Sequence, residues 1–502
     1  MAAKNPSTDT AAAGAGRPVA TASLLILLAV LIAAMRFHTY GEPLERDITL
    51  YAVIAHEMLS GRELYSDLWD HKPPAVFVAY AAAEAVAGYG RAAIFLLNVA
   101  ASAASLAGIW LISRRMSGPA PAVVAAILWT FVSGDLHLEA NQPNTEVFLN
   151  ALLVWGVALM VKEPGRRAAV FAAAALFGAA SLFKHVAVFP AALIAFASVS
   201  GSRGRGRFAP LLTIGTAGFL MWAGVFAYFA GTGRGGDFYR AVIETNVFYA
   251  GSAVSAPRAV MMIALAAAAF ALIARATALD RQQAVFTAYC AGTLLAVAVQ
   301  PRFFPHYFQL WLPPAAIAAG HIASRLRHTR WGSGAVAVSL VLVCAFEARH
   351  YLLPAERWSE IKYGPIFIAA ANAAPDAARR AGPGSLYVWG SEPAFYFIAE
   401  KSPPAGVILH YPLMQGPQAE ELTRRTVRDL EKARPELIVL NEEVRMDHDV
   451  PRWILRRYDI LAVAAPAPFR FLARRSEMGV EAGRQPAKNQ PADDQSAGRA
   501  DR

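Results

Sequence analysis

The sequence predicts a polytopic α-helical membrane protein with a small α/β domain near its C-terminus. Of the 502 residues, 56% are hydrophobic and only 17% are charged, whereas soluble proteins carry charge on about a quarter of their residues. Several apolar runs reach the ~20 residues that a helix needs to cross a bilayer. After residue 355, strand and helix patterns alternate instead, which predicts the α/β domain.

Apolar runs predict about eleven spans between residues 19 and 350. The runs cover residues 19–36, 92–113, 119–133, 146–161, 168–183, 185–200, 208–230, 258–274, 282–299, 307–323 and 333–347. Five basic loops separate some of them: "SRRMSG", "KEPGRR", "GSRGRGR", "ARATALDR" and "SRLRHTRW". Basic loops favour the cytoplasmic side. With all five there, the N-terminus is cytoplasmic, and the loop 37–91 and the chain after about residue 348 face outward.

The apolar stretch 73–88, "PPAVFVAYAAAEAVAG", is short and is interrupted by Glu84. If it crossed the membrane, Arg114 and Arg115 would face outward, against the positive-inside tendency. We therefore predict a re-entrant or interface-lying helix on the outer side. The sequence alone leaves a true span open.

The two ends of the chain differ from the membrane part. "SLYVWG" (385–390) and "ELIVL" (436–440) predict buried strands, while "SEPAFYFIAEK" and "GPQAEELTRRTVRDLEKARP" predict helices. These elements place an α/β domain at residues 355–475, on the outer face. The cytoplasmic residues 1–18 and the tail 476–502 lack apolar periodicity and are predicted to be disordered.

Charged residues gather in the loop 37–91, directly after the first span. Its segment "DITLYAVIAHEML" has the apolar spacing of a helix that starts at Asp47, and Asp67, Asp70, His71 and Lys72 follow. A carboxylate can act as a general base on a hydroxyl, and a cation can neutralise a phosphate. Together they suit a reaction in which an acceptor hydroxyl attacks a sugar carbon and a lipid phosphate leaves. Each residue alone is more often an ordinary exposed charge.

Other outward loops contribute polar residues close to the hydrocarbon. Glu146 falls in the first turn of a span, and Lys184, His185, His306 and Tyr307 lie at the ends of spans. A charge at such a depth is costly unless it faces a cavity or a partner, although cations near span ends also snorkel and aromatic residues form belts. Groups of both signs at one membrane face predict a shared cavity. Tight metal-ligand spacing is absent from the sequence, so we expect no required metal, and a divalent cation bridging a carboxylate and a phosphate stays open.

The stretch "PLERDITLYAVIAHEMLSGRELYSDLWDHKPP" resembles the first outer loop of polyprenyl-phosphate-sugar-dependent glycosyltransferases of the GT-C fold. These are glycosyltransferase family 39 and relatives, among them protein O-mannosyltransferases and lipid A aminoarabinose transferases. The matching elements are Arg46-Asp47, Tyr51, Gly61, Tyr65-Ser66-Asp67 and Lys72-Pro73-Pro74. "PNTEVFLNALLVW", "SLFKHVAVF", "PHYFQLWLPPA" and "LYVWGSEPAFYFIAEKSPP" are similar to later segments, so the likeness covers about residues 19–475.

The resemblance implies a GT-C domain over residues 19–350 and an inverting glycosyltransferase. Such an enzyme would move a sugar from a polyprenyl-phosphate donor to an acceptor hydroxyl at the outer (periplasmic) face of a bacterial-type cytoplasmic membrane. Asp47 matches the catalytic carboxylate, and Lys72 matches the lysine that holds the lipid phosphate. From their positions at the ends of spans, we expect Lys184 and His306 to contact the phosphate as well. The supporting candidates are Arg46, Tyr65, Asp67, Asp70, His71, Glu146, His185 and Tyr307.

One position departs from the family pattern. Ile48 stands where many members have a second acid. The motif therefore carries one carboxylate, and Glu45 or Asp70 are the neighbours that could assist it.

Two other functions stay open from the sequence: a transporter or flippase of lipid-linked sugars, and a non-catalytic relative that binds lipid. A transporter needs ionisable residues near mid-bilayer and broken spans. Here the span centres are largely free of charge, which favours chemistry at the membrane surface. The expected partners are the membrane, the lipid-linked donor and a protein, lipid or polysaccharide acceptor, with no nucleic acid. The sequence indicates neither the sugar nor the acceptor.

Overall fold

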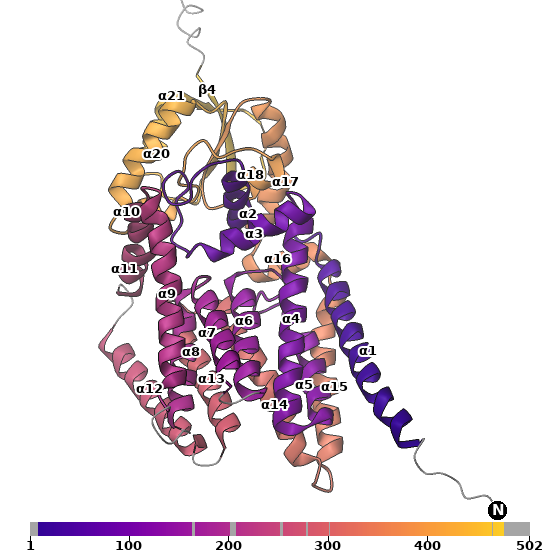
Figure 1. Ribbon diagram of the computed structural model, residues 1–502. Helices are drawn as coiled ribbons and strands as arrows, with labels where there is room; N and C mark the ends of the chain where they lie inside the picture. The colour runs from indigo at the N-terminus through magenta and orange to yellow at the C-terminus, as the bar shows by residue number, and fades with distance from the viewer. Residues whose placement is uncertain are drawn as a thin grey trace, which may run out of the picture.

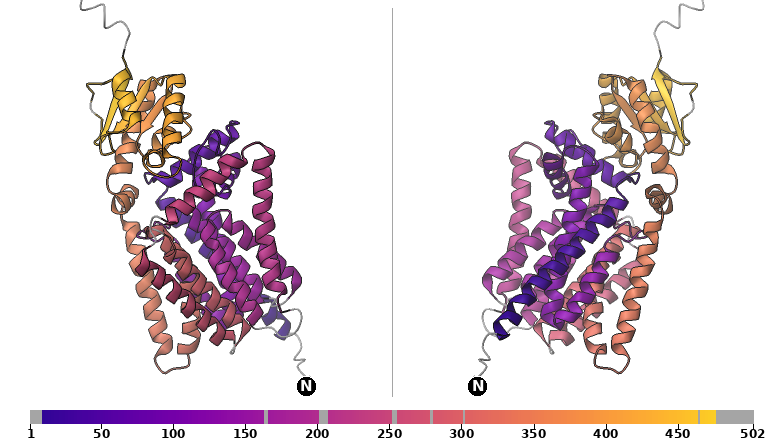
Figure 2. Two further views of the ribbon diagram at one scale, coloured as in Figure 1. Left: turned by 90° about the vertical axis from the view of Figure 1, so that its left-hand side faces the viewer. Right: turned by 90° about the vertical axis from the view of Figure 1, so that its right-hand side faces the viewer.

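The computed structural model describes residues 9–162, 166–200, 207–251, 255–277, 280–300, 302–463 and 465–475. It shows a long bundle of helices with a smaller α/β unit at one end, and helix α1 (Asp9–His38) begins at the opposite end (Figure 1, Figure 2). Helices α2 and α3 lie between the bundle and the α/β unit (Figure 1).

Five helices among the described residues are long and apolar enough to cross a membrane. They belong to α1 (Asp9–His38), α4 (Arg91–Ser117), α6 (Thr145–Lys162), α9 (Ala209–Gly231) and α15 (Gly332–Ala348). Helix α1 begins before residue 19, so the disordered segment predicted for residues 1–18 is helical from Asp9 on. The alanines of this stretch are strong helix formers. Residues 1–8 and the predicted disordered tail 476–502 lie outside the described residues.

Shorter helices complete the bundle. They are α5 (Pro119–Val132), α7 (Arg167–Ser181), η1 (His185–Ala187), α8 (Val188–Ser200), α12 (Ala256–Thr277), α13 (Arg281–Ala298), η3 (Pro305–Trp311), α14 (Leu312–Leu326) and η4 (Arg349–Leu352). Gly118 lies between α4 and α5 with φ +95°, and Pro119 opens the next helix, so the chain reverses without a longer loop. The figure of eleven spans stays a prediction. The basic loops at 162–167 and 201–207 fall largely outside the described residues.

Small residues let the helices of the bundle approach closely. Helix α13 packs along α8, and a Cβ added at Gly292 of α13 would lie 2.3 Å from the Cα of Pro190 in α8. We expect Gly292→Ala to lower the free energy of unfolding by about 1–3 kcal/mol, because backbone atoms cannot yield as a flexible side chain can. Thermal unfolding in detergent measures this. As a matched control, Gly224→Ala adds a methyl group where the structure has nothing within 4 Å, so a similar loss in both variants would contradict the packing argument.

The loop 37–91 folds into two short helices, α2 (Arg46–Leu59) and α3 (Ala75–Ala87). Glu45 caps α2 by accepting a hydrogen bond from the backbone N–H of Asp47 at 2.9 Å, and Gly61 after the helix has φ +93°. Helix α3 has 13 residues, which at ~1.5 Å per residue is shorter than the hydrocarbon core. Glu84, which interrupts its apolar run, contacts His56 Nδ1 of α2 at 2.7 Å. The membrane depth of α3 stays a prediction.

The segment after α9 returns toward the α/β unit as three short elements, α10 (Gly235–Phe238), the π-helix η2 (Tyr239–Glu244) and α11 (Thr245–Gly251). Gln418 Nε2 of the α/β unit donates to the carbonyl of Arg240 at 2.8 Å and to Thr245 Oγ1 at 3.0 Å. This turn of π-helix is therefore held by the C-terminal part of the chain.

The α/β unit has a four-stranded sheet in the order β1-β2-β4-β3. Strands β1 and β2 are parallel, with Leu386 opposite Leu437, and β4 runs antiparallel to both β2 and β3. The predicted strands at 385–390 and 436–440 are confirmed as β1 and β2, and all their residues are buried. The elements are α16 (Ala355–Tyr363), α17 (Ile366–Ala381), β1 (Leu386–Trp389), α18 (Ala394–Ala399), α19 (Tyr411–Met414), α20 (Ala419–Ala433), β2 (Leu437–Asn441), α21 (Asp449–Arg457), β3 (Tyr458–Ile460) and β4 (Phe469–Arg474).

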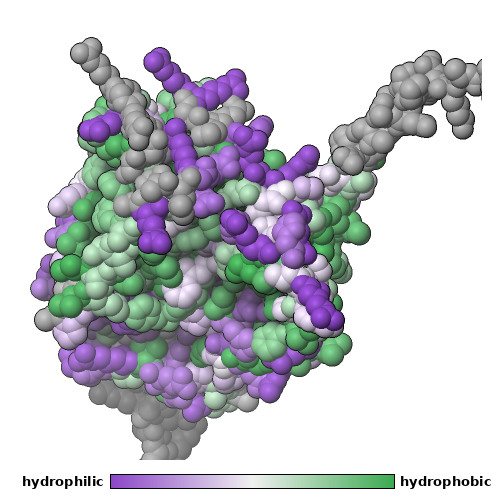
Figure 3. Space-filling model, turned by 90° about the horizontal axis from the view of Figure 1, so that it is seen from below, coloured by the Kyte–Doolittle hydropathy of each residue, from purple (hydrophilic) through white to green (hydrophobic). Residues whose placement is uncertain are grey.

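The end of the bundle opposite the α/β unit carries hydrophilic residues scattered between apolar ones (Figure 3). Arg114 and Arg115 end α4 on this side, and Arg325 lies in the last turn of α14. Cations near a helix C-terminus also interact favourably with the helix dipole.

Candidate active site

Asp47 lies between two cations in the first turn of α2. Lys72 Nζ is 3.7 Å from its Oδ2 atom, and Arg46 Nε donates to its Oδ1 atom at 3.3 Å. The side chains of Asp47 and Lys72 are only 16% and 15% exposed. The cap at Glu45 fixes the start of the helix, so the position of Asp47 follows from local structure.

The neighbouring charges decide the protonation of Asp47. Burial alone would raise its pKa, but Lys72, Arg46 and His306 outweigh burial and hold the pKa well below the ordinary value. The adjacent Glu45 behaves in the opposite way, because burial and the charge of Asp47 raise its pKa to about 7. Asp47 is therefore an ionised carboxylate at neutral pH beside a carboxyl group that can hold a proton.

Tyr65 and Asp70 hold the backbone of Lys72. The Tyr65 hydroxyl donates to the Lys72 carbonyl at 2.8 Å, and Asp70 Oδ1 accepts from the Lys72 N–H at 2.7 Å. Tyr65 has φ +73° and its buried ring packs on Phe229. These two predicted site residues therefore support Lys72.

Asp67 is not brought to Asp47. Its side chain is exposed, and its Oδ2 atom accepts from the backbone N–H of Glu63 at 2.9 Å. This bond closes the turn before Lys72. The structure gives Asp67 a role in the turn.

A pH dependence of stability follows from Asp70. Burial raises its pKa from an ordinary 3.8 to about 6, against the Lys72 cation and the Lys72 N–H, which favour ionisation. Between pH 4 and 6 the unfolded chain loses this proton first, so the native state holds more protons and the free energy of unfolding falls as pH rises. An asparagine does not titrate, so we expect the free energy of unfolding of Asp70→Asn, relative to that of the wild type, to rise by up to about 3 kcal/mol between pH 4 and pH 7. Melting curves at both pH values check this, and a constant difference would contradict it.

A second charged group lies between α6 and the turn before η1. Glu146 is fully buried, and Lys184 Nζ contacts its Oε1 atom at 2.5 Å. Thr145 Oγ1 donates to the other carboxylate oxygen at 2.9 Å, and Lys184 Nζ lies 3.7 Å from the ring centroid of Tyr307. Glu146 thus has the partner that a buried charge requires.

His306 links the two groups. Its Nδ1 atom is 2.9 Å from Glu139 Oε2, and its pKa is raised because hydrogen bonding to Glu139 and the charge of Glu146 overcome burial. Its charge acts on Asp47, and the charge of Glu146 acts on Lys72. The three cations predicted to bind phosphate, Lys72, Lys184 and His306, therefore belong to one electrostatic cluster.

The two other histidines predicted for the site, His71 and His185, differ in their surroundings. His71 Nδ1 is 3.1 Å from the Tyr411 hydroxyl, and its carbonyl accepts from Asn246 Nδ2 at 2.7 Å. His185 stacks on Trp222 with ring centroids 5.2 Å apart, and its buried Nε2 atom has no hydrogen-bond partner among the described residues. His71 thus joins the loop to the α/β unit, while His185 packs within the bundle.

The α/β unit closes one side of the site, which the sequence did not indicate. Tyr411 of this unit contacts His71 in the loop. In addition, the carbonyl of Gly406 accepts from the backbone N–H of Trp69 at 2.9 Å, and Arg425 Nη2 donates to the Asp67 carbonyl at 2.8 Å. These partners lie some 340 positions from the loop in the chain, for example 340 for Tyr411 and His71. Spacing in the sequence holds no signal for such contacts.

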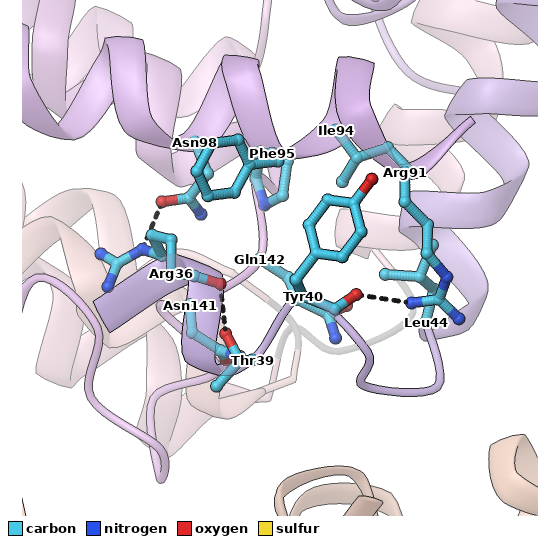
Figure 4. A pocket seen from close by; sticks show the side chains of 11 residues that line it. Arg36, Thr39, Tyr40, Leu44, Arg91, Ile94, Phe95, Asn98, Asn141 and Gln142 are labelled. Atoms are coloured by element: carbon cyan, nitrogen blue, oxygen red, sulfur yellow. Dashed lines mark hydrogen bonds between the residues drawn. The ribbon is translucent and has the colours of Figure 1, made fainter. Parts of the chain in front are cut away.

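A small cavity lies beside the site, next to α1, α4 and the segment before α6 (Figure 4). Its two arginines already hold protein groups: Arg36 Nε donates to Asn98 Oδ1 at 2.6 Å, and Arg91 Nη1 donates to the Tyr40 carbonyl at 3.0 Å. Gln142 Oε1 accepts from the N–H of Glu45 at 3.4 Å, which ties the cavity wall to α2. We interpret the residues around this cavity as holding the start of α2 in place and not as a binding site for substrate. In the part of the chain that the structure describes, no three His, Cys, Asp or Glu side chains are close enough to hold a metal.

Comparisons with known proteins bear on the fold. Residues 71–229 match the family model described as dolichyl-phosphate-mannose-protein mannosyltransferase. The structure of ArnT from Cupriavidus metallidurans bound to undecaprenyl phosphate matches with a TM-score of 0.58 at 14% identity, over 91% of this chain and 98% of ArnT. The chain has the GT-C fold. The apo state of ArnT matches with a TM-score of 0.56 at 14% identity, over 90% and 98% of the two chains.

The structural match agrees with the GT-C fold that the sequence resemblance implied, and the long apolar helices support a multi-pass membrane protein. The archaeal oligosaccharyltransferase AglB from Archaeoglobus fulgidus is a more distant structural match, with a TM-score of 0.45 at 12% identity over 84% of this chain and 69% of AglB. No curated protein sequence matches the chain.

Proposed function

We propose that this chain is an inverting glycosyltransferase that moves a sugar from a polyprenyl-phosphate donor to an acceptor hydroxyl. The observation that carries the proposal is the half-buried carboxylate of Asp47, 3.7 Å from Lys72 Nζ and 3.3 Å from Arg46 Nε, at one end of a GT-C bundle. The match of residues 71–229 to a mannosyltransferase family model supports it. The basic loops favour a site at the outer face of a bacterial-type cytoplasmic membrane.

The donor phosphate belongs on the cationic side of the site. Lys72, Lys184 and His306 gather there, and burial lowers the pKa of Lys184 even though Glu146 opposes the shift. A phosphate would offset this cost through charge-assisted hydrogen bonds. ArnT, which has the same fold, was solved with undecaprenyl phosphate. In our proposal the isoprenoid chain stays in the bilayer while these cations stabilise the negative charge of the leaving phosphate.

Asp47 accepts the proton of the acceptor hydroxyl. As the hydroxyl oxygen bonds to the anomeric carbon, the bond from that carbon to the phosphate oxygen breaks and the polyprenyl phosphate leaves with the electron pair. Attack from the face opposite the phosphate inverts the anomeric centre. Since Lys72 holds the pKa of Asp47 low, a phosphate that neutralises Lys72 raises the basicity of Asp47 when the donor is bound.

The experiment is transfer by the purified protein in vesicles that contain radiolabelled polyprenyl-phosphate sugars, with detergent extract from membranes of a strain lacking the protein as acceptor. We expect labelled product whose new linkage has the opposite anomeric configuration to the donor, as read by NMR. Retained configuration would contradict the inverting mechanism. Absence of transfer from every donor tested would contradict the proposed function.

Lys72→Met tests the phosphate site separately. We expect its affinity for undecaprenyl phosphate to fall at least tenfold, since a charge-assisted contact contributes about 1.5–3 kcal/mol. Binding is measured by quenching of tryptophan fluorescence. Lys401→Met is the control, because Lys401 Nζ binds backbone carbonyls of Gly382 and Gly384 in the α/β unit. Equal affinities in both variants would remove Lys72 from the phosphate site.

A further inference from the structure

The carboxyl ends of β1 and β2 form a polar edge in the α/β unit. Ligands of parallel sheets bind outside this edge. Here Ser391 and Glu392 follow β1, and Asn441 ends β2. Glu392 accepts from Asn441 Nδ2 at 3.1 Å and from the Ser391 N–H at 2.9 Å.

A hydroxyl and an imidazole are paired at the same edge. Ser391 Oγ lies 2.9 Å from His410 Nδ1. The backbone N–H of His410 donates to the carbonyl of Gly390 at 3.0 Å. Beneath them, Trp389 is fully buried and stacks on His448 with centroids 5.6 Å apart. Its Nε1 atom has no hydrogen-bond partner among the described residues, although a buried indole N–H usually has one.

This edge is connected to the loop that carries Asp47. Tyr411, the neighbour of His410, contacts His71 at 3.1 Å, and α18 packs on α2. Burial raises the pKa of Glu392 to about 6, and the positive charge of Arg46 acts against that rise. Arg46 is 39% exposed and bonds Asp47 through Nε, which leaves its two terminal nitrogens without a hydrogen bond to the described residues.

We propose that Ser391 and His410, at the carboxyl edge of β1, bind the acceptor, and that the acceptor is a carbohydrate. This inference rests on the proposed function and adds the side from which the acceptor enters. Lys184 and His306 come from the bundle, so the side formed by the α/β unit is the one left for the second substrate. Arg46 lies where the two sides meet.

The chemistry of the edge favours a sugar over a peptide. The Ser391 hydroxyl and the His410 imidazole supply a hydrogen-bond donor and an acceptor side by side, which suits a ring rich in hydroxyl groups. A peptide would most simply add to an exposed strand edge. Strand β1 does lie at the edge of the sheet, but all four of its residues are buried and α17 packs against it.

The test varies the amount of acceptor. Transfer from the labelled polyprenyl-phosphate sugar is measured against a dilution series of the membrane extract, for Ser391→Ala and His410→Gln. We expect the half-saturating amount of extract to rise at least fivefold while the maximal rate is recovered at high extract. The affinity for undecaprenyl phosphate should stay within twofold, which also shows that the variants are folded.

The matched controls are Ser117→Ala and His321→Gln, because these residues form the same hydroxyl–imidazole pair, also at 2.9 Å, between α4 and α14. Both controls should keep the wild-type half-saturation. An unchanged half-saturation in the Ser391 and His410 variants, or a fall in their affinity for undecaprenyl phosphate, would overturn the inference.

The class of acceptor is tested on the extract itself. Loss of acceptor activity after periodate oxidation, with resistance to protease, supports a carbohydrate. The reverse pattern would overturn the choice of a sugar. A wild-type protein that transfers nothing would overturn the proposed function, whereas a wild type and variants that transfer alike would overturn this inference alone.

Discussion

Asp47→Asn is expected to lower the rate of sugar transfer by about 10²–10⁴-fold, the range that a positioned general base contributes. The asparagine keeps the shape of the side chain but cannot take the acceptor proton. It also removes the anion that faces Lys72 at 3.7 Å and Arg46 at 3.3 Å. Both cations are then free for the donor phosphate, so undecaprenyl phosphate should bind at least as tightly as in wild type. Initial rates and fluorescence binding curves measure the two effects.

Asp67→Asn is the matched control in the same loop. The Asp67 carboxylate is exposed, and among the described residues it accepts a hydrogen bond from the Glu63 backbone N–H alone; an asparagine oxygen can accept the same bond. We expect transfer within twofold of wild type. If Asp67→Asn lost as much activity as Asp47→Asn, or if Asp47→Asn stayed active, the assignment of the base would be wrong.

Lys362→Met should cause the largest loss of stability, about 3–5 kcal/mol in the free energy of unfolding. Lys362 Nζ in α16 lies 2.6 Å from Glu42 Oε1, and each side chain is only 1% exposed. Asn141 joins them, donating to Glu42 at 2.6 Å and accepting from Lys362 at 2.9 Å. Methionine leaves the Glu42 carboxylate buried without its cation. Thermal unfolding in detergent measures the loss.

The double variant Glu42→Gln with Lys362→Met should recover most of that stability, because it removes the unpaired charge as well. The exposed pair of Arg379 with Asp376 is the control: Arg379 is 72% exposed, and Arg379→Ala should cost no more than about 1 kcal/mol. A loss in Lys362→Met as small as in the control would show that the Glu42 pair does not hold α16 to the loop before α2.

The sequence by itself determined several of the elements and the placement of Asp47 and Lys72 in one loop. Apolar runs long enough for a bilayer, the helix beginning near Asp47 and the buried strands β1 and β2 are local patterns, set by composition and by periods of 3.6 and 2 residues. The resemblance that indicated the GT-C fold rested on motifs within one loop.

Only the tertiary structure decided which predicted residues meet. It paired His306 with Glu139, 167 positions apart, and brought Tyr411 to His71. It also directed the Asp67 carboxylate to the Glu63 backbone N–H and not to Asp47, although Asp67 lies only five positions before Lys72 in the sequence. The physical reason is that burial, ion pairing and pKa depend on which distant segments pack together, and no local pattern in the chain encodes that packing.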